Sequence, residues 1–277
     1  MSTLTVYPPA KINLSLKITG KRDDGFHELE TLVLPLPGLT DELHFEEATQ
    51  FTLHCDTLGV PTNQSNLVSR ALRLFEKNTG KEAPYRVTLK KRIPHGAGLG
   101  GGSSDAASTF LALNQLTGAS VPLSRLAQWA GELGSDIPLF IYESASWCRG
   151  KGEIVEPVDL TWTFPILLFK PSFSIPTPWA YSRWSNSLEI PGISYGSIKV
   201  GEIDLYNDLE RPVFEKHRFL AELKQFLLEQ PETQNSMMSG SGSTVFAILN
   251  DQKEAAPLIE RTLRELDPNL WTHLAIF

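Results

Sequence analysis

The fold is decided by the stretch Arg92-Ile93-Pro94-His95-Gly96-Ala97-Gly98-Leu99-Gly100-Gly101-Gly102-Ser103-Ser104-Asp105-Ala106-Ala107, in which five of the seven residues from 96 to 102 are glycine. An alternating run at residues 85–89 predicts a strand before it, and residues 106–116 predict a helix after it. Glycine permits positive φ and a close approach of the backbone to a ligand, and the first N–H groups of a helix are unpaired. The order strand, glycine loop, helix therefore predicts a phosphate-binding site.

Two better-known glycine motifs fit this stretch less well. The Walker motif requires Gly-Lys-Ser/Thr, whereas Gly102 is followed by Ser103, so the lysine that would reach the phosphates is missing. Three of the glycines do satisfy G-x-G-x-x-G, but a dinucleotide fold also needs a second strand that ends in an acid about twenty residues later. Residues 115–134 predict a helix instead. A ligand-free flexible turn would need one or two glycines, not five.

The composition is that of an ordinary globular protein, with 277 residues, 41% hydrophobic and 21% charged, enough for one large domain or two ordinary ones. A net charge of −7 argues against a nucleic-acid partner, so local groups must hold any anion. The only cysteines, Cys55 and Cys148, argue against a disulfide scaffold and favour a reducing compartment. Neither a charged-then-apolar leader nor an apolar run of membrane length is present, so we expect a cytoplasmic protein without a membrane partner.

Candidate polar residues lie on a strand near the N-terminus, predicted at residues 3–18. Lys11 and Asn13 alternate with aliphatic residues and therefore share one face of this strand, which is either a solvated surface or part of a site. The turn that follows leads to Phe26 and His27 at the start of a second extended segment. A hairpin would bring that pair near Lys11 and Asn13.

Two acids have alternative interpretations. Asp136 lies between the C-capping Gly134 and an apolar segment with Pro138 at an early helical position. It is either the N-cap of a short helix or a buried acid that faces the phosphate site. Asp105 follows the two serines of the glycine loop, where it is either a helix cap or part of a metal site.

The remaining pattern alternates helices and strands and predicts an α+β fold. A second glycine segment, Ser239-Gly240-Ser241-Gly242, leads into a strand, and the motif Asn207-Asp208-Leu209-Glu210 precedes a helix. Further helices are predicted at 67–77, capped by Asn66, and at 123–133, 212–229 and 252–266. Further strands are predicted at 26–36, 41–46, 51–55, 164–169, 245–249 and 272–277. A domain boundary is expected near residue 155.

The pattern Pro94-x-x-x-Gly98-Leu99-Gly100-x-x-Ser103-Ser104 resembles the phosphate loop of the GHMP superfamily of small-molecule kinases, which includes galactokinase, homoserine kinase, mevalonate kinase and phosphomevalonate kinase. Further motifs resemble one branch of it, which acts on a methylerythritol linked to cytidine diphosphate in non-mevalonate isoprenoid synthesis. They occur in the family's order: Pro9-Ala10-Lys11-Ile12-Asn13-Leu14, Gly25-Phe26-His27, Gly134-Ser135-Asp136-Ile137-Pro138, Gly150-Lys151-Gly152-Glu153, Ser174-Ile175-Pro176-Thr177-Pro178 and Ser239-Gly240-Ser241-Gly242.

This resemblance implies a two-domain α+β fold of the GHMP-kinase type with the active site in the cleft between the domains. The N-terminal, ATP-binding domain is expected at residues 1–155 and the C-terminal domain at 156–277. The implied reaction transfers a phosphoryl group from ATP, with Mg²⁺, to the 2-hydroxyl of the cytidine-diphosphate-linked alcohol. The alternatives are another kinase of the superfamily, of the homoserine or mevalonate type, or a non-catalytic nucleotide-binding protein.

The resemblance also implies roles for individual residues. Asp136 would accept or orient the proton of the acceptor hydroxyl, while Lys11 would polarise that hydroxyl and keep Asp136 ionised. The residues expected to bind ATP are Pro94, His95, Gly96, Ala97, Gly98, Leu99, Gly100, Gly101, Gly102, Ser103 and Ser104, with Asn66 and Leu67 near the base. Those expected to bind the acceptor are Asn13, Phe26, His27, Thr177 and Tyr181. The family usually has tyrosine where this chain has Phe26, so the ring's role here is apolar.

Overall fold

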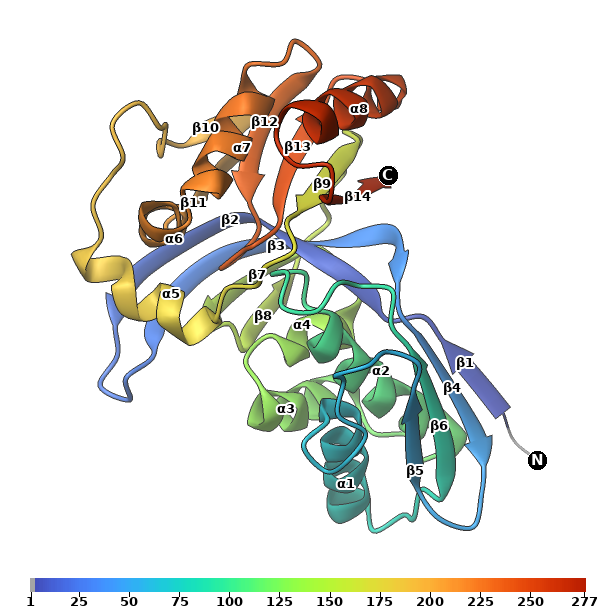
Figure 1. Ribbon diagram of the computed structural model, residues 1–277. Coiled ribbons are helices and arrows are strands. Elements are labelled where there is room, and N and C mark those ends of the chain that lie inside the picture. The colour runs from blue at the N-terminus through green and yellow to red at the C-terminus, as the bar shows by residue number, and fades with distance from the viewer. Residues whose placement is uncertain (1–2) are drawn as a thin grey trace.

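A long antiparallel hairpin, β2 (Pro9–Lys21) and β3 (His27–Thr40), runs through the middle of the protein in the computed structural model, which describes residues 3–277 (Figure 1). It forms the centre of a six-stranded sheet in the order β10-β11-β2-β3-β7-β8. The outer strands of this sheet are β10 (Ile198–Val200), β11 (Ile203–Asn207), β7 (Ser146–Gly150) and β8 (Ile154–Pro157). Residues 10–16 of β2 are all buried, so other elements cover both faces of this part of the strand.

One body of the protein lies at the N-terminal end of the hairpin, at the lower right of Figure 1. Its four-stranded sheet has the order β1-β4-β6-β5, and helices lie along one side of it. Its core contains the fully buried rings of Phe45, Phe75 and Phe110, each of which stabilises the fold by roughly 1.5–3 kcal/mol. The strands are β1 (Thr3–Val6), β4 (Glu42–Glu47), β5 (Thr52–Cys55) and β6 (Tyr85–Lys90), and the helices are α1 (Leu67–Thr79), α2 (Gly101–Leu116), α3 (Leu123–Leu133) and α4 (Ile137–Tyr142).

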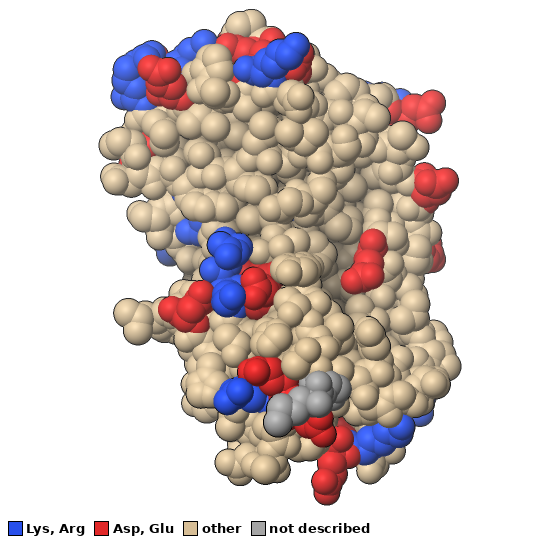
Figure 2. Space-filling view, turned by 90° about the vertical axis from the view of Figure 1, so that its right-hand side faces the viewer, with Lys and Arg blue, Asp and Glu red and all other residues tan. Residues whose placement is uncertain are grey.

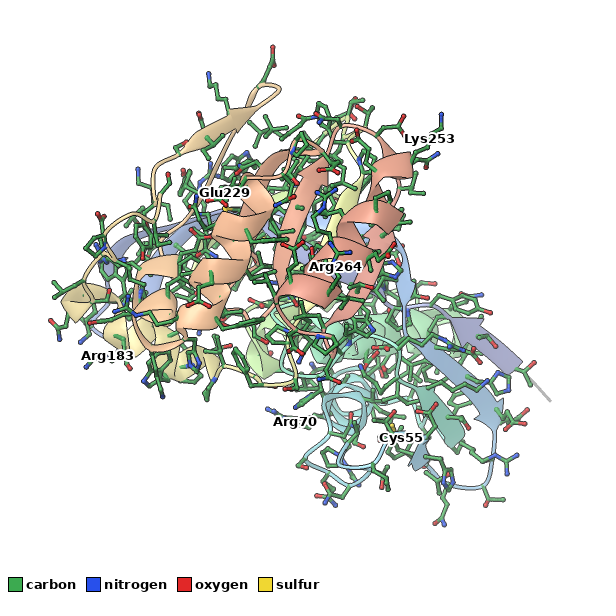
Figure 3. All side chains as sticks on the ribbon, turned by 45° about the horizontal axis from the view of Figure 1, so that its top comes forward. Cys55, Arg70, Arg183, Glu229, Lys253 and Arg264 are labelled. Carbon is green, nitrogen blue, oxygen red and sulfur yellow. The ribbon has the colours of Figure 1, made fainter. Side chains whose placement is uncertain are left out.

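The second body contains a four-stranded sheet in the order β12-β13-β9-β14, with α7 and α8 on one of its faces (Figure 1). Figure 3 shows side chains filling the space between these two helices and the strands beneath them. The strands are β9 (Ile166–Lys170), β12 (Thr233–Met238), β13 (Val245–Leu249) and β14 (Trp271–Ala275), and the helices are α5 (Thr177–Arg183), α6 (Glu210–Lys216), α7 (Arg218–Leu228) and α8 (Ala255–Glu265).

A third hydrophobic cluster joins the two bodies. Ile12 and Leu14 of β2 pack in it with Ile166, Leu168 and Phe246 of the second body. In addition, β11 pairs in parallel with β2, and residue 155 lies within β8. The division into domains at residue 155 stays a prediction, and both the sheet and this cluster extend across it.

Most of the elements predicted from local patterns are confirmed. The helix at 123–133 has the predicted bounds, and the strand predicted at 85–89 is β6. The helix capped by Asn66 is confirmed as well, because the Asn66 side chain accepts a hydrogen bond from Val68 N at 2.8 Å. It ends two residues later than predicted, before the left-handed Gly80.

Other predictions need correction. The helix expected at 106–116 begins at Gly101, because the left-handed Gly100 ends the loop there and its two successors are helical. The helix expected at 212–229 is broken at His217, which has φ −109° and ψ 70° and separates α6 from α7. Strand β12 was not predicted, because its polar first half, Thr-Gln-Asn-Ser, lacks the apolar pattern of a buried strand.

The predicted surroundings of the N-terminal hairpin also need correction. Lys11 is paired with Pro35 and Asn13 with Val33, whereas His27 is paired with Lys21 at the far end of the hairpin. The hairpin therefore does not place Phe26 and His27 beside Lys11. Nor is the polar face of β2 a solvated surface, since Lys11 and Asn13 are each only 5% exposed.

Charged side chains of both signs are interspersed on the face shown in Figure 2, where they form no continuous basic patch. This mixture is consistent with 25 basic and 32 acidic residues. Among the helices of residues 3–277, none is long and apolar enough to cross a membrane.

The two glycine loops are packed against each other so tightly that a side chain at Gly98 is excluded. Gly98 has φ +77°, and a Cβ built on it would lie 2.4 Å from the carbonyl oxygen of Ser239. We expect Gly98→Ala to lower the free energy of unfolding by about 2 kcal/mol or more, because left-handed strain and overpacking each cost about 1–3 kcal/mol. Urea denaturation measures this change.

Gly102→Ala provides the matched control. Its Cβ would meet nothing closer than Leu67 Cδ1 at 3.8 Å, and the residue lies inside α2. This substitution should leave the stability unchanged or raise it by up to ~1 kcal/mol. Equal stability of the two variants would contradict the packing of the glycine loops described here.

Candidate active site

A cavity of about 930 Å³ opens where the phosphate loop, β2, the start of α4, α5 and the second glycine loop meet. This volume is near the upper end of the range for small-molecule sites. Every predicted site residue except Ser104 lines the cavity. Ser104 is fully buried in α2 and its hydroxyl has no hydrogen-bond partner among the described residues, so its predicted contact with ATP is not supported by its position.

The phosphate loop passes directly over β2. Lys11 N donates to Leu99 O at 3.0 Å, and a Cβ on Gly100 would lie 3.0 Å from Lys11 Cγ and 2.7 Å from Phe140 Cζ. Only glycine fits there. The first intrahelical hydrogen bond of α2 runs from Ser104 N to Gly100 O, at 2.9 Å, so the N–H groups before Ser104 have no helical acceptor. These groups are suited to bind an anion at the helix N-terminus.

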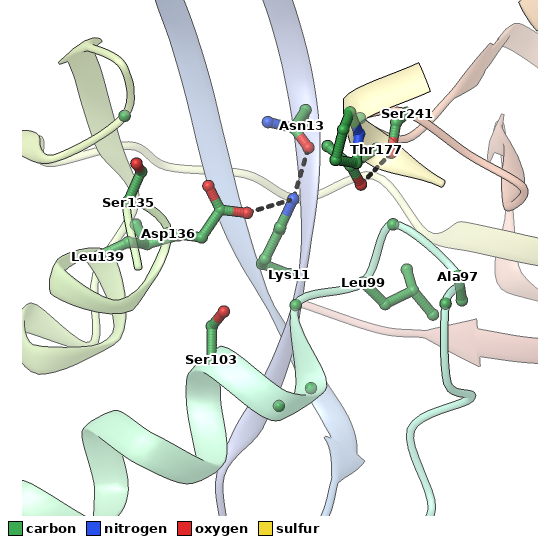
Figure 4. Close-up of a pocket in the computed structure, with 18 of the residues that line it drawn as sticks. Lys11, Asn13, Ala97, Leu99, Ser103, Ser135, Asp136, Leu139, Thr177 and Ser241 are labelled. Carbon is green, nitrogen blue, oxygen red and sulfur yellow. Dashed lines mark hydrogen bonds and ion pairs between the residues drawn. The ribbon is translucent and has the colours of Figure 1, made fainter. Parts of the chain in front are cut away.

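Lys11 and Asp136 face each other across the cavity, with 4.0 Å between Lys11 Nζ and Asp136 Oδ2 (Figure 4). The ammonium is held from behind by Asn13, whose Oδ1 accepts from Lys11 Nζ at 2.7 Å and whose Nδ2 donates to Thr31 Oγ1 at 2.8 Å. Figure 4 also shows Ser103 projecting from the first turn of α2 towards the space beside this pair.

Each interpretation of Asp136 is correct only in part. The residue occupies the N-cap position of α4, but its side chain makes no capping hydrogen bond. It is not buried either, since its side chain is 58% exposed while that of Lys11 is 6% exposed. An open carboxylate therefore faces a buried ammonium, and both retain capacity to bind a third group between them.

Burial lowers the pKa of Lys11, and the nearby carboxylate of Asp136 opposes this shift. Cys148 lies at the same cavity, and its burial raises the pKa of the thiol to about 12. The cysteine is therefore an uncharged group at neutral pH, and only the thiolate is a good nucleophile.

Aromatic rings gather in the part of the cavity lined by α5 and the start of β3. His27 stacks on Tyr181 of α5 with ring centroids 5.5 Å apart and meets the edge of Trp184 at 5.8 Å. Burial, followed by the charge of Lys21, lowers the pKa of His27, which favours the neutral imidazole at pH 7. His27 and Lys11 line the same cavity although they are not neighbours in the hairpin.

Polar and charged groups flank these rings. Lys151 Nζ lies 4.8 Å from the centre of the Phe26 ring, and Thr177 Oγ1 is hydrogen-bonded to Ser241 Oγ at 2.8 Å (Figure 4). Several residues at the cavity were not proposed individually from the sequence: Lys21, Lys91, Lys151, Trp184, Gly240 and Ser241. The motifs that contain Lys151 and Ser241 were noticed, but nothing in either motif indicates which of its side chains faces a ligand.

Residues 66–144 match the GHMP kinases N terminal domain, and residues 199–267 match the GHMP kinases C terminal domain. The 4-diphosphocytidyl-2-C-methyl-D-erythritol kinase of Protochlamydia amoebophila is 41% identical over 92% of this chain and 88% of that protein. The kinase of the same name from Methylacidiphilum infernorum is 37% identical over 97% of this chain and 94% of that protein.

The chain belongs to the 4-diphosphocytidyl-2-C-methyl-D-erythritol kinase family.

A crystal structure of 4-(cytidine 5'-diphospho)-2C-methyl-D-erythritol kinase superposes with a TM-score of 0.79 and 34% identity, covering 99% of this chain and all of that one. Homoserine kinase from Cytophaga hutchinsonii shares the fold, with a TM-score of 0.73 at 17% identity over 100% of this chain and 94% of that one. The protein is thus an ATP-dependent small-molecule kinase with the α+β GHMP-kinase fold.

Behind the phosphate loop, this kinase contains a buried ionic cluster of Asp41, Lys91 and Asp105. Lys91 Nζ is paired with Asp41 and lies 2.7 Å from Asp105 Oδ2. Asp41 Oδ1 also accepts from the backbone N of Ile93 at 2.9 Å. A Cβ on Gly101 would lie 3.2 Å from Lys91 Nζ, so the ammonium is directly beneath the first turn of α2.

The helix-cap interpretation of Asp105 is wrong, because Gly100 occupies the N-cap position and Asp105 lies in the second turn of α2. Asp105 is 3% exposed and its Oδ1 has no partner among the described residues. Burial raises the pKa of Asp105 to about 7, although Lys91 opposes the shift. Burial alone would lower the pKa of Lys91, but Asp105 and Asp41 outweigh it and the pKa is raised.

Asn66 uses its side chain within the protein. Its Oδ1 caps α1 and its Nδ2 donates to Pro61 O at 2.6 Å. These two hydrogen bonds fix the orientation of the amide at the cavity and leave one N–H donor and one acceptor position unused. Leu67 follows it at the rim of the same cavity.

The raised pKa of Asp105 predicts a particular dependence of stability on pH. Between pH 4 and 7 the folded protein binds a proton at Asp105 that the unfolded chain has released, so this residue's contribution to stability falls as the pH rises. Asp105→Asn removes this titration. We therefore expect the stability of the variant relative to the parent to increase from pH 5 to pH 8.

Urea denaturation of both proteins at several pH values measures the difference between their free energies of unfolding. Titrations that the two proteins share cancel in this difference. Asp159→Asn, at an exposed site outside the cavity, serves as the control for the loss of an acidic side chain. A constant difference between Asp105→Asn and the parent would contradict the raised pKa.

Proposed function

We propose that this kinase transfers the γ-phosphoryl group of ATP to the 2-hydroxyl of 4-diphosphocytidyl-2-C-methyl-D-erythritol. The names of the relatives support this substrate. The single observation that supports it best is the Lys11–Asp136 pair, 4.0 Å apart, in the same cavity as a glycine loop that opens a helix. Phosphoryl transfer requires charge neutralisation and an aligned acceptor, and these groups are of the kinds that supply both.

On the donor side, the proposed site for the triphosphate is the phosphate loop from Pro94 to Ser103. The backbone N–H groups that precede Ser104 lack helical acceptors, so they are available to phosphate oxygens. The adenine would lie near Asn66 and Leu67, at the rim of the cavity beside the start of α1.

At the reaction centre, we assign Asp136 to the acceptor hydroxyl. Its exposed carboxylate can accept the hydroxyl proton or orient the oxygen towards the γ-phosphorus. Lys11 is the adjacent cation, held in place by Asn13, and would offset negative charge on the attacking oxygen and on the transferred group.

At the other end of the cavity, the cytidine would be bound by Phe26, His27 and Tyr181. Their rings supply faces for stacking, and a neutral imidazole can both donate and accept a hydrogen bond at the edge of a cytosine. Phe26 lacks a hydroxyl, and Lys151 lies over one face of its ring. Asn13 and Thr177 would lie closer to the methylerythritol and the diphosphate.

Mg²⁺ would bind here together with the phosphates of ATP rather than at a site formed by protein ligands alone. Among residues 3–277, no group of three or more His, Cys, Asp and Glu side chains is arranged to hold a metal ion. Mg²⁺ commonly keeps several waters and binds substrate phosphates with one or two protein ligands, and the hydroxyl of Ser103, which projects from the first turn of α2 into the cavity, would be one such ligand. When bound, the ion would neutralise phosphate charge.

A coupled assay of ADP release tests the proposed substrate. We expect ATP-dependent turnover with the diphosphocytidyl alcohol and none with homoserine or mevalonate, because only the former supplies a base for the aromatic end of the cavity. Turnover with one of the other alcohols and not with the cytidyl compound would contradict the proposal in favour of another kinase of the superfamily. Absence of transfer to any acceptor would favour a non-catalytic nucleotide-binding protein.

Asp136→Asn tests the proposed reaction centre. Because the carboxylate acts on the acceptor in the transition state, we expect kcat to fall by about 10²–10⁴-fold while ATP affinity stays nearly unchanged. Asp159→Asn is a control with the same substitution on the exposed surface. Equal losses of kcat and ATP affinity in Asp136→Asn would show that the residue belongs to the nucleotide site.

A further inference from the structure

The motif Asn207-Asp208-Leu209-Glu210 lies at the end of β11 and the start of α6, and it contributes no residue to the cavity lining that the structure describes. Two of its polar side chains are nevertheless buried, with Asn207 5% and Glu210 2% exposed. Burying polar groups is unfavourable unless they are hydrogen-bonded. The partners of these side chains therefore indicate what the motif does.

Asn207 and Glu210 both bind the backbone at the end of β12, where the second glycine loop, residues 239–242, begins. Asn207 Nδ2 donates to Met238 O at 2.7 Å and to Gly240 O at 2.8 Å. Glu210 Oε1 accepts from Met238 N at 2.9 Å, and its other oxygen is paired with Lys224 Nζ at 2.6 Å. Three hydrogen bonds thus hold two residues at the base of this loop.

The same motif is tied to β2, the strand that carries Lys11. Asp208 Oδ2 accepts from Ile18 N at 2.7 Å, and Asp208 N donates to Leu16 O at 2.9 Å. Asn207 Oδ1 accepts from Leu209 N at 2.9 Å, which fixes the orientation of the amide. The motif is therefore a rigid link between β2 and the second glycine loop.

The second glycine loop in turn contacts the groups of the reaction centre. Ser239 Oγ donates to Gly98 O of the phosphate loop at 3.2 Å and accepts from Asn13 N at 3.3 Å. A Cβ on Gly240 would lie 3.0 Å from Asn13 Oδ1 and 3.7 Å from Lys11 Nζ. Gly240 therefore lies close to the oxygen that orients the Lys11 ammonium.

We propose that Asn207, assisted by Glu210, is a positioning residue for phosphoryl transfer, which acts through the second glycine loop on Asn13 and Lys11. Asparagine suits this position because one NH₂ group satisfies two carbonyl oxygens while the amide oxygen accepts a backbone N–H. The inference rests on the proposed function, since its effect is on the alignment of the reacting groups.

Asn207→Asp is the sharpest test, because it preserves size and the acceptor but replaces the two donors with an oxygen that faces two carbonyl oxygens. We expect kcat with ATP and the diphosphocytidyl alcohol to fall by roughly 10- to 100-fold, since a displacement of about 1 Å can cost 10²-fold. The Kd of a non-hydrolysable ATP analogue should change by less than about 3-fold, because the loss occurs in the transition state.

Asn235→Asp is the matched control. Asn235 is a 2% exposed asparagine in β12, and its Oδ1 accepts from Ser236 N rather than binding the loop. We expect this variant to have a lower Tm with kcat essentially unchanged. If both variants lose Tm and neither loses kcat, or if their kcat values fall together, Asn207 has only a structural role and the inference is overturned.

A double-mutant cycle with Ser239→Ala shows whether Asn207 acts through the loop. Losses of kcat that are clearly less than additive in Asn207→Asp/Ser239→Ala would support the inference, and fully additive losses would contradict it. If Asn207→Asp does not fold, we expect the same loss of kcat in Asn207→Ser, whose side chain keeps one short donor.

The parent protein is assayed first with the cytidyl alcohol. Failure to phosphorylate this alcohol would overturn the proposed function itself.

Discussion

The buried ammonium of Lys11 is the group on which the rest of the site depends. A cation is costly to remove from water unless it is paired and hydrogen-bonded, and Lys11 has one amide oxygen behind it and one carboxylate in front. Its backbone N–H also binds Leu99 O, so the same residue that carries the charge anchors the phosphate loop. The position of β2 therefore determines where the phosphate loop lies and where the Lys11 ammonium meets the acceptor hydroxyl.

Local charge, rather than the charge of the whole chain, makes the cavity suitable for anions. The chain has a net charge of −7, yet four lysines line the cavity: Lys11, Lys21, Lys91 and Lys151. Of the acids that line the cavity, Asp105 is paired with Lys91 beneath α2 and Asp136 faces Lys11. An anion in this cavity is attracted by lysines at short range. Its repulsion by the acidic residues of the outer surface is screened by solvent and salt.

Features that depend on neighbouring residues could be predicted from the sequence. The cap at Asn66, the bounds of α3 and the nature of the glycine loop each follow from a short pattern. Features that depend on distant segments could not. The Asp41–Lys91–Asp105 cluster forms only when three segments meet, and His27 reaches the site because α5 packs against it, not because of the hairpin register. The pairing of Lys11 with Asp136 was expected from family resemblance, since no local pattern relates a β-strand near residue 11 to a helix start at residue 136.

A crystal structure with a non-hydrolysable ATP analogue and the diphosphocytidyl alcohol tests the central claim most directly. We expect the 2-hydroxyl to lie within hydrogen-bond reach of both Asp136 and Lys11, with its oxygen about 3–3.5 Å from the γ-phosphorus and in line with the bond to be broken. A hydroxyl bound away from this pair, or a triphosphate bound outside the glycine loop, would contradict it.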